Sequence, residues 1–444
     1  MSQVFKGDVT NNVVELNLQA GAANIGSSSY GLGGTSNGEI KVVHKGDITQ
    51  SDGFYDARAD LKGLVIGTSC TSIGSNAFYY CSGLTGSLVI PDSVTTIGSN
   101  AFHMGFGGDS WSGSLTIPNS VTTIGSYAFY YCSGLTGSLT IPDSVTTIEG
   151  SVFGQCTGLT GDLVIPDSVT SIGDYAFIAC TGFTSLTISD SVTNINSGAF
   201  YICSGLTGSL TIPNSVTNIG QYAFKGCTGF TSLTIPNSVT NIGQYAFWDC
   251  TSLTGSLTIP DSVATIGSDA FKGCNSLTSL TLPINPSFNT IGARTFKNCT
   301  SMTGNLIIPS NVTVINSEAF GHCSFTGHLN IPDTVTSIGT FCFASNNFTS
   351  ITIGSGLTAI PNGLMYLCAS LTGTLVLPST VASVGNNAFN GCAFTRIEYY
   401  ITSPPPTSVN PFAGGNNATE IHVPASSSWV AGNTWNGLTV VKDL

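Results

Sequence analysis

Residues 209–231 read SLTIPNSVTNIGQYAFKGCTGFT, and residues 232–247 repeat the first sixteen letters of this stretch unchanged. Self-similarity at a fixed period of about 20 to 50 residues is typical of solenoids, in which each unit packs only on its neighbours. The period is marked by a recurring proline, mostly every 23 or 24 residues, at Pro91, Pro118, Pro142, Pro166, Pro213, Pro236, Pro260, Pro283, Pro309, Pro332 and Pro378. Between about Leu64 and Cys392 this spacing predicts about 13 to 14 turns.

Each repeat predicts two short strands and a compact turn. Leu210 and Ile212 alternate with a polar residue, which indicates a strand with one buried face, and Pro213 ends that strand. The run 216–219 places Val and Ile inward in a second short strand. The run 222–227, with its Ala, Phe and Cys, is typical of one or two helical turns. We therefore predict a leucine-rich-repeat type of solenoid with a parallel β-sheet, a short second strand and a short helical turn per repeat.

The repeated pattern LTIPxSVTxIGxxAFxxCxxLTSLTIP resembles the BspA-like subclass of leucine-rich repeats. The resemblance covers roughly three quarters of the chain. It implies a protein of the kind found on the surfaces of anaerobic bacteria and protozoan parasites and in large viruses. It implies little about a particular ligand, because one repeat scaffold hosts many partners.

Composition narrows the possible partners. Only 8% of the residues are charged and the formal net charge is −12, which argues against nucleic acid because nucleic-acid binding requires a basic stripe. No apolar run is long enough to insert into a membrane. We expect no secretory signal peptide, since residues 1–10 lack a basic segment followed by an apolar one. The compartment therefore stays open, with a cell surface or a virion favoured over a cytoplasmic enzyme role.

Cysteine is repeated with the turns. Of the 14 cysteines, twelve share one register position: Cys81, Cys132, Cys156, Cys180, Cys203, Cys227, Cys250, Cys274, Cys299, Cys323, Cys368 and Cys392. Side chains that project in parallel along a ladder are poorly aimed for bridging, so we predict buried free thiols. No Cys-x-x-Cys or Cys/His spacing predicts a metal site or redox cofactor.

The two ends depart from the repeat. We predict an N-terminal β-rich cap or attachment segment over residues 1–62, the repeat solenoid over 63–393, and a C-terminal cap over 394–444. Strand-like alternation appears at 13–18 and 39–44, and again at 396–400 and 420–423. After the last of these, Trp429 and Trp435 resemble the helix-like closing stretch of the same repeat proteins.

Two outward rows are candidate binding surfaces. The first is a row of hydroxyls on the strand face, which includes Thr140, Thr187, Thr211, Thr234 and Thr258. The second is an aromatic row around the Ala-Phe pairs, with Tyr127, Tyr175, Tyr222, Tyr245 and Trp248. Trp111, in an inserted loop that breaks the repeat, is a further candidate. Two plainer interpretations stay open: the hydroxyls only solubilise the sheet, and the rings are half-buried against one another.

Catalysis and metal binding find little support. The five histidines lie in different contexts, and no nucleophile elbow or phosphate loop is present. An acidic row shares one register position and contains Asp92, Asp143, Asp167, Asp190, Asp261 and Asp333. Asp143, Asp167 and Asp190 follow one another in consecutive turns and could hold Ca²⁺. We expect instead that each carboxylate accepts hydrogen bonds from amides of its own turn.

The sequence thus predicts a non-enzymatic scaffold without catalytic, cofactor or metal residues. We expect it to recognise a protein or a glycan through the Ser/Thr-rich face and the neighbouring aromatics. The alternative is a structural subunit of a virion or surface assembly, docked through its non-repeat ends and above all through residues 1–62.

Overall fold

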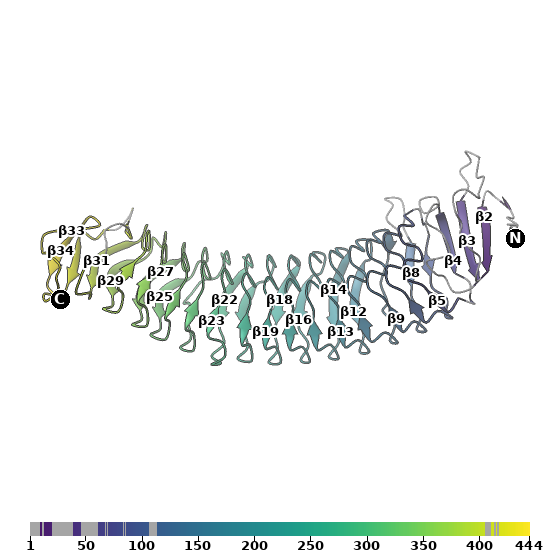
Figure 1. Cartoon of the computed structure of the whole chain (residues 1–444), viewed down its shortest axis with the longest axis horizontal. Coiled ribbons are helices and arrows are strands. Elements are labelled where there is room, and N and C mark those ends of the chain that lie inside the picture. Colours follow the sequence, from purple (N-terminus) through teal and green to yellow (C-terminus); the bar gives the residue numbers. More distant parts are fainter. Residues whose placement is uncertain are drawn as a thin grey trace. The chain divides into compact units, whose positions relative to one another are not determined.

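The computed structural model describes residues 9–10, 13–19, 39–45, 61–66, 68, 70–82, 84, 86–105, 113–404, 410–412, 414 and 417–444. The chain divides into two compact units, Met1–Phe230 and Thr231–Leu444. Each unit is a stack of turns whose strands pair in parallel (Figure 1), which confirms the predicted solenoid.

Most turns of the first unit contribute a strand to each of two series, which we call ladders. The first ladder contains β6 (Leu88–Val89), β8 (Gly113–Thr116), β10 (Leu135–Thr136), β12 (Gly161–Ile165), β14 (Phe183–Ile188) and β16 (Gly208–Thr211). The second contains β5 (Ser72–Ile73), β7 (Thr96–Ile97), β9 (Thr123–Ile124), β11 (Thr147–Ile148), β13 (Ser171–Ile172), β15 (Asn194–Ile195) and β17 (Asn218–Ile219). The register is constant along the second ladder, where Ile148 faces Ile172 and Ile172 faces Ile195.

The second unit repeats this arrangement. Its first ladder contains β18 (Phe230–Thr234), β20 (Gly255–Thr258), β22 (Leu277–Thr281), β25 (Thr326–Ile331), β27 (Asn347–Ile353), β29 (Thr372–Leu377) and β31 (Ala393–Tyr399). Its second contains β19 (Asn241–Ile242), β21 (Thr265–Ile266), β23 (Thr290–Ile291), β24 (Val314–Ile315), β26 (Ser337–Ile338), β28 (Ala359–Ile360) and β30 (Ser383–Val384).

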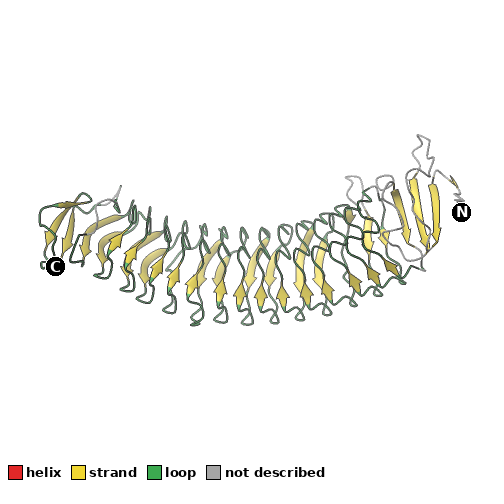
Figure 2. Cartoon of the chain, viewed as in Figure 1, coloured by secondary structure: helices red, strands yellow, loops and turns green. Residues whose placement is uncertain are grey.

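The expected helical turn is the one part of the repeat that differs, since the described residues contain no helix (Figure 2). The amides of Tyr175 and Phe177 donate to carbonyl oxygens in the next turn, whereas those of Ala176 and Ile178 donate three residues back. An α-helix would require every amide to bond four residues back. Tyr175 also adopts a left-handed backbone, with φ of 56°. The segment therefore forms alternating turns, because half of its amides join neighbouring repeats.

The core consists of stacked phenylalanines flanked by thiols. In the first unit the rings of Phe78, Phe102, Phe129, Phe153, Phe177, Phe200 and Phe224 stack with successive centroids 5.2 to 5.7 Å apart. All 14 cysteines are buried, and none of them forms a disulfide bond. Each ladder thiol from Cys132 to Cys227 donates to the carbonyl oxygen of the phenylalanine one turn earlier, at 2.9 to 3.0 Å. The thiols therefore add a second hydrogen bond to carbonyl oxygens that already accept a backbone amide, as the Phe129 carbonyl accepts the amide of Cys132 at 3.2 Å.

One turn of the second unit replaces the thiol by an amide. Asn346 lies in the cysteine position and is 2% exposed. Its Nδ2 donates to the carbonyl oxygen of Phe320 at 2.8 Å, the role that the Cys323 thiol plays toward Phe296. Its Oδ1 accepts the amide of Phe325. An amide donor can therefore take the place of the thiol at this position.

Both ends of the chain carry further strands. In the first unit β1 (Val9–Thr10), β2 (Val13–Gln19), β3 (Glu39–Lys45) and β4 (Leu61–Ile66) form one sheet in chain order. In the second unit β32 (Glu420–Val423) and β34 (Leu438–Lys442) extend the ladder of β31, and β33 (Thr434–Trp435) pairs antiparallel with β34. The strands expected at both ends are therefore present, whereas the boundaries at 62 and 393 stay predictions.

The closing tryptophans are buried in turns and in a strand, not in a helix. Trp435 belongs to β33, and Trp429 follows a turn. Their rings lie 5.7 Å apart, and Trp435 also lies 6.2 Å from the ring of Tyr399. Apolar packing of these rings covers the last turns of the described core.

Candidate binding surfaces

The hydroxyl row lies on the outward side of the first ladder. Thr187 stands opposite Val164 across β12 and β14, and Thr258 stands opposite Thr281 across β20 and β22. The candidate threonines Thr140, Thr187, Thr211, Thr234 and Thr258 are all exposed. Serines of the same face bond across turns, as Ser279 does to Ser256 at 2.6 Å. The row is therefore an array of hydroxyls whose spacing is set by strand pairing.

His328 interrupts this row in the second unit. Its Nδ1 lies 2.8 Å from the Ser350 hydroxyl, and its Nε2 lies 3.1 Å from that of Thr352. The imidazole ring thus bridges two hydroxyls of the adjacent strand. It adds a polar ring to an otherwise aliphatic and hydroxyl surface.

The aromatic row follows from the left-handed positions of the turn segment. Tyr127, Tyr175, Tyr222 and Tyr245 all have φ between 56° and 61°. This backbone region is costly for residues with a Cβ atom. The left-handed conformation recurs at the tyrosine that precedes the Ala-Phe pair in each of these turns. The tyrosine side chain therefore lies outside the core, whereas the Phe side chain lies within it.

An aromatic cluster fills one end of the described row in the first unit. Tyr127 and Tyr130 meet edge to face at 5.4 Å, and His103 lies 5.2 Å from Tyr130. Burial lowers the pKa of His103. Burial, together with Tyr131 and Tyr127, raises the pKa of Tyr130. The cluster comprises Tyr79, Tyr80, His103, Tyr127, Tyr130 and Tyr131.

Part of each ring remains accessible. Tyr80 and Tyr127 are each 43% exposed, and Tyr131 is 40% exposed. Other rings of the row pack directly against glycines of the next turn. A Cβ atom on Gly154 would lie only 2.7 Å from the Tyr130 ring, and one on Gly198 would lie only 2.3 Å from the Tyr175 ring. The row is thus neither fully buried nor freely solvated.

Cations accompany the aromatic row farther along each unit. In the first unit the Lys225 ammonium lies 5.3 Å from the Tyr201 ring and 5.4 Å from the Tyr222 ring. In the second unit Tyr245 and Trp248 lie 5.1 Å apart, and the Lys272 ammonium lies 4.5 Å from the Trp248 ring. These distances fit cation–π contacts.

The lysine and arginine edge of the second unit is ion-paired. Asp269 is 1% exposed and binds Arg294 through both oxygens, at 2.8 and 2.9 Å, and Lys272 at 3.4 Å. The bidentate bond to Asp269 raises the pKa of Arg294. Lys297 forms a further ion pair, through its ammonium, with one carboxylate oxygen of Glu318. The edge is therefore a nearly neutral network rather than a solvated basic patch, and the role of Asp269 was missed from sequence because its partner lies 25 residues away.

Three members of the acidic row bond to the following turn. Asp167 accepts the Ser189 hydroxyl at 2.7 Å, Asp261 accepts the amide of Ile284, and Asp333 accepts both groups of Ser355. These bonds lower the pKa of Asp333. The expectation of bonds within one turn was therefore wrong for these three residues. Within the described ranges, no three acidic, histidine or cysteine side chains gather as metal ligands would.

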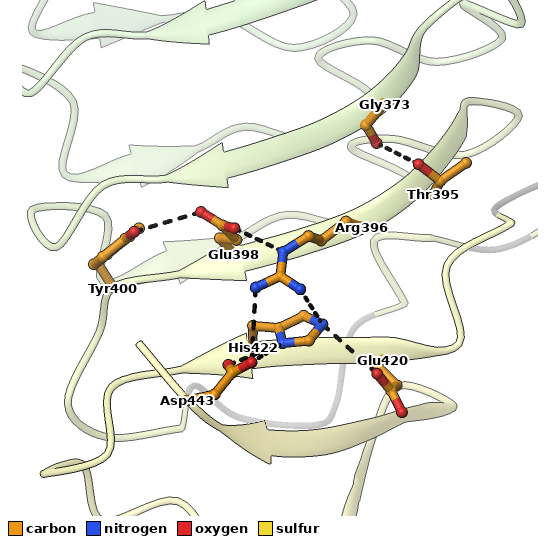
Figure 3. A network of polar contacts seen from close by, with 8 residues as sticks. All are labelled: Gly373, Thr395, Arg396, Glu398, Tyr400, Glu420, His422 and Asp443. Atoms are coloured by element: carbon orange, nitrogen blue, oxygen red, sulfur yellow. Dashed lines mark hydrogen bonds and ion pairs between the residues drawn. The ribbon is translucent and has the colours of Figure 1, made fainter.

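A polar network on the C-terminal strands is the second feature that sequence analysis missed (Figure 3). His422 Nε2 lies 3.1 Å from Arg396, and its Nδ1 lies 2.9 Å from Asp443. A guanidinium only donates, so Nε2 accepts and the Nδ1 proton points to Asp443. Glu398 binds Arg396 at 2.7 Å. The imidazole nitrogens are thus both engaged in joining β31, β32 and the residues after β34, an arrangement suited to clamping strands.

The predicted site residues therefore occupy two repeated surfaces, with one exception. Trp111 and residues 106–110 of its inserted loop lie outside the described residues. No helix of the described part is both long and apolar enough to cross a membrane.

Comparison with known proteins decides the family. A model of the BspA type leucine rich repeat region, with six copies, matches residues 47–137, 106–228, 204–324 and 289–404. The chain belongs to the BspA-type leucine-rich repeat family. Among curated proteins, no sequence matches it.

Solved structures of bacterial leucine-rich repeat proteins are similar to this family member. A leucine-rich repeat protein from Bacteroides ovatus is 25% identical, with a TM-score of 0.54 over 74% of this chain and 82% of that one. A leucine-rich repeat protein from Eubacterium ventriosum is 23% identical, with a TM-score of 0.44 over 76% and 85% of the two chains. A leucine rich cell surface protein from Faecalibacterium prausnitzii is 23% identical, with a TM-score of 0.36 over the whole of both chains.

Proposed function

We propose that this BspA-type repeat protein is a non-enzymatic binding scaffold at a cell or particle surface. It recognises a protein or a glycan through the outward threonines of its first strand ladder together with the aromatic row. The observation that supports this most is the aromatic cluster of residues 79–131, whose rings contact one another and yet stay up to 43% exposed. Clustered, partly exposed aromatic residues are enriched in binding surfaces.

The strand face adds a second element. Its threonines project from paired strands about 4.8 Å apart, so a flat partner can meet several hydroxyls at once. Hydroxyls both donate and accept, which suits recognition of amides or sugar hydroxyls without a charged group. The binding energy would be divided among many equivalent contacts, as on other repeat proteins.

The test compares matched surface variants on a printed array of oligosaccharides and peptides. One variant carries Thr187→Lys, Thr211→Lys and Thr234→Lys on the strand face, and another carries Tyr127→Ala and Tyr131→Ala. The control carries Thr122→Lys, Thr146→Lys and Thr170→Lys, which adds the same charge at exposed positions beside the second ladder. We expect the signals of the unmodified protein to disappear with the first two variants and to persist with the control. If all three folded variants kept the signals of the unmodified protein, both surfaces would be excluded as binding sites.

A second function is favoured by the sheet at the start of the first unit. There β1 pairs antiparallel with β2, unlike the parallel ladders that follow. A distinct terminal sheet is suited to docking a structural subunit into a larger assembly. Deletion of residues 1–60 would abolish incorporation into such an assembly under this alternative, whereas a loss of solubility alone would indicate a cap.

A further inference from the structure

A hollow in the first unit lies beside two positions whose residues differ from those of most other repeats. It has a volume of about 460 Å³ and is lined by Asp143, Val164, Ile165, Pro166, Asp167, Ser168, Thr187 and Ser189. Val164 occupies the outward position that threonine holds in most turns, and Ser189 occupies the position of the repeated proline. The two substitutions come from adjacent turns: Val164 lies in β12, where it pairs with Thr187 of β14, and Ser189 directly follows β14.

Ser189 shapes the polar wall of this hollow. It is 8% exposed, donates to Asp167 at 2.7 Å and accepts the amide of Ser191 at 3.1 Å. A proline ring at this position would supply no hydroxyl and would hold no carboxylate in place. The hydrogen bond from the Ser189 hydroxyl thereby holds the Asp167 carboxylate in place through its Oδ1 atom.

The lining combines hydrogen-bond acceptors with an apolar wall. Asp143 and Asp167 present carboxylates, Thr187 presents a hydroxyl, and Val164, half exposed, presents methyl groups beside Pro166. Ligand pockets typically join an apolar surface to a few placed polar groups, in volumes of about 300 to 1,000 Å³. A ligand that suits this lining has several hydroxyl donors on one side and C–H groups on the other.

We propose that this hollow binds one uncharged sugar residue of a glycan. The carboxylates accept its hydroxyls in charge-assisted hydrogen bonds, and Val164 packs on the C–H face of its ring. Two carboxylates disfavour an anionic sugar by like-charge repulsion. The two alone also fall short of the ligand set that Ca²⁺ prefers. The proposal rests on the proposed binding function, because Thr187 belongs to both surfaces, and it names the ligand class.

The test uses methyl pyranosides of glucose, galactose, mannose and N-acetylglucosamine as probes in saturation-transfer NMR with the full chain. Concentrations up to about 20 mM are needed, since a single-ring ligand is expected to bind with a Kd of about 1 mM. Ser189→Pro restores the residue of neighbouring turns, and Asp167→Asn introduces the residue found at Asn119, Asn214 and Asn237, so both variants are compatible with the fold. Asp92→Asn makes the same change outside the hollow and is the control.

We expect saturation transfer to at least one pyranoside, at least about tenfold weaker binding for Ser189→Pro and Asp167→Asn, and unchanged binding for Asp92→Asn. Methyl glucuronide should bind more weakly than methyl glucoside. The absence of transfer to every pyranoside, equal binding by all variants, or binding of CaCl₂ alone in calorimetry would overturn the proposal. If array binding were still lost in the threonine or tyrosine variants, the proposed function would stand while the sugar site would fall.

Discussion

Inward and outward side chains of the same turn segment follow different rules. In the run 175–180, Phe177 and Cys180 are fully buried and continue columns that recur in nearly every turn. Ile178, between them, is half-buried, and the same position holds Tyr130, a glycine or Lys225 in other turns. The inward pair is constant because Phe177 stacks on the rings of both neighbouring turns and the Cys180 thiol donates to a carbonyl oxygen one turn earlier. The outward position is free to vary, so recognition is expected there.

The largest expected effect comes from ionising the inward thiols. Burial raises the pKa of Cys180 and of Cys368 to about 12, from an ordinary value of 9.0. Because the folded pKa lies above the unfolded one, the stabilisation is complete below about pH 9 and is lost as the pH rises toward 12. Each such thiol costs about 1.4 kcal/mol per pH unit in this window. Circular dichroism against pH should show alkaline unfolding, with thiolate absorbance rising together with it and not before.

Removing one ring of the inward stack should be the next largest effect. Phe177→Ala leaves a cavity between Phe153 and Phe200 and should lower the free energy of unfolding by about 3 to 5 kcal/mol in denaturant titrations. The outward control, Ile178→Ala, should cost less than about 1.5 kcal/mol because its side chain is only half-buried. Similar losses for the two variants would erase the distinction between the columns.

The amide at residue 346 tests whether the thiol position requires a donor. Asn346→Ala leaves the Phe320 carbonyl and the Phe325 amide without these partners and should cost about 2 to 4 kcal/mol. Asn346→Cys restores a donor to Phe320 and should cost about 1 to 2 kcal/mol. The comparison by thermal and denaturant unfolding would count against a hydrogen-bonding role if alanine were tolerated as well as cysteine.

The smallest expected effect lies on the outward acidic row. Bonds from the amide and hydroxyl of Ser355 lower the pKa of Asp333. A depressed pKa stabilises the fold above the unfolded value of about 3.8, and this contribution is lost as the pH falls through the folded value. Asp333→Asn should therefore flatten the dependence of unfolding free energy on pH below about 4. An unchanged slope would show that the Ser355 bonds do not persist in solution.

The order of the strands was predictable from the sequence, because Leu210 and Ile219 mark the two strands of a repeat and Pro213 marks the end of the first, all at a spacing that recurs along the chain. The turn segment was not, since the Phe and Cys spacing of one repeat fits a helix as well as alternating turns. Only stacking reveals that alternate amides bond to the next turn. The same reason hid Asp269 with Arg294 and His422 with Asp443, pairs separated by 25 and 21 residues. The threonine and tyrosine rows were visible as repeats, whereas the hollow beside Ser189 required the geometry of two adjacent strands.

The accessibility of thiols in the native chain tests the central claim most directly. All 14 cysteines should resist a small alkylating reagent at neutral pH and react together once the chain is unfolded, because each is buried against neighbouring turns. Mass spectrometry of chymotryptic peptides would identify the modified residues, because no lysine or arginine lies between Lys62 and Lys225. Prompt alkylation of Cys180 or Cys203 in the folded protein would contradict the account.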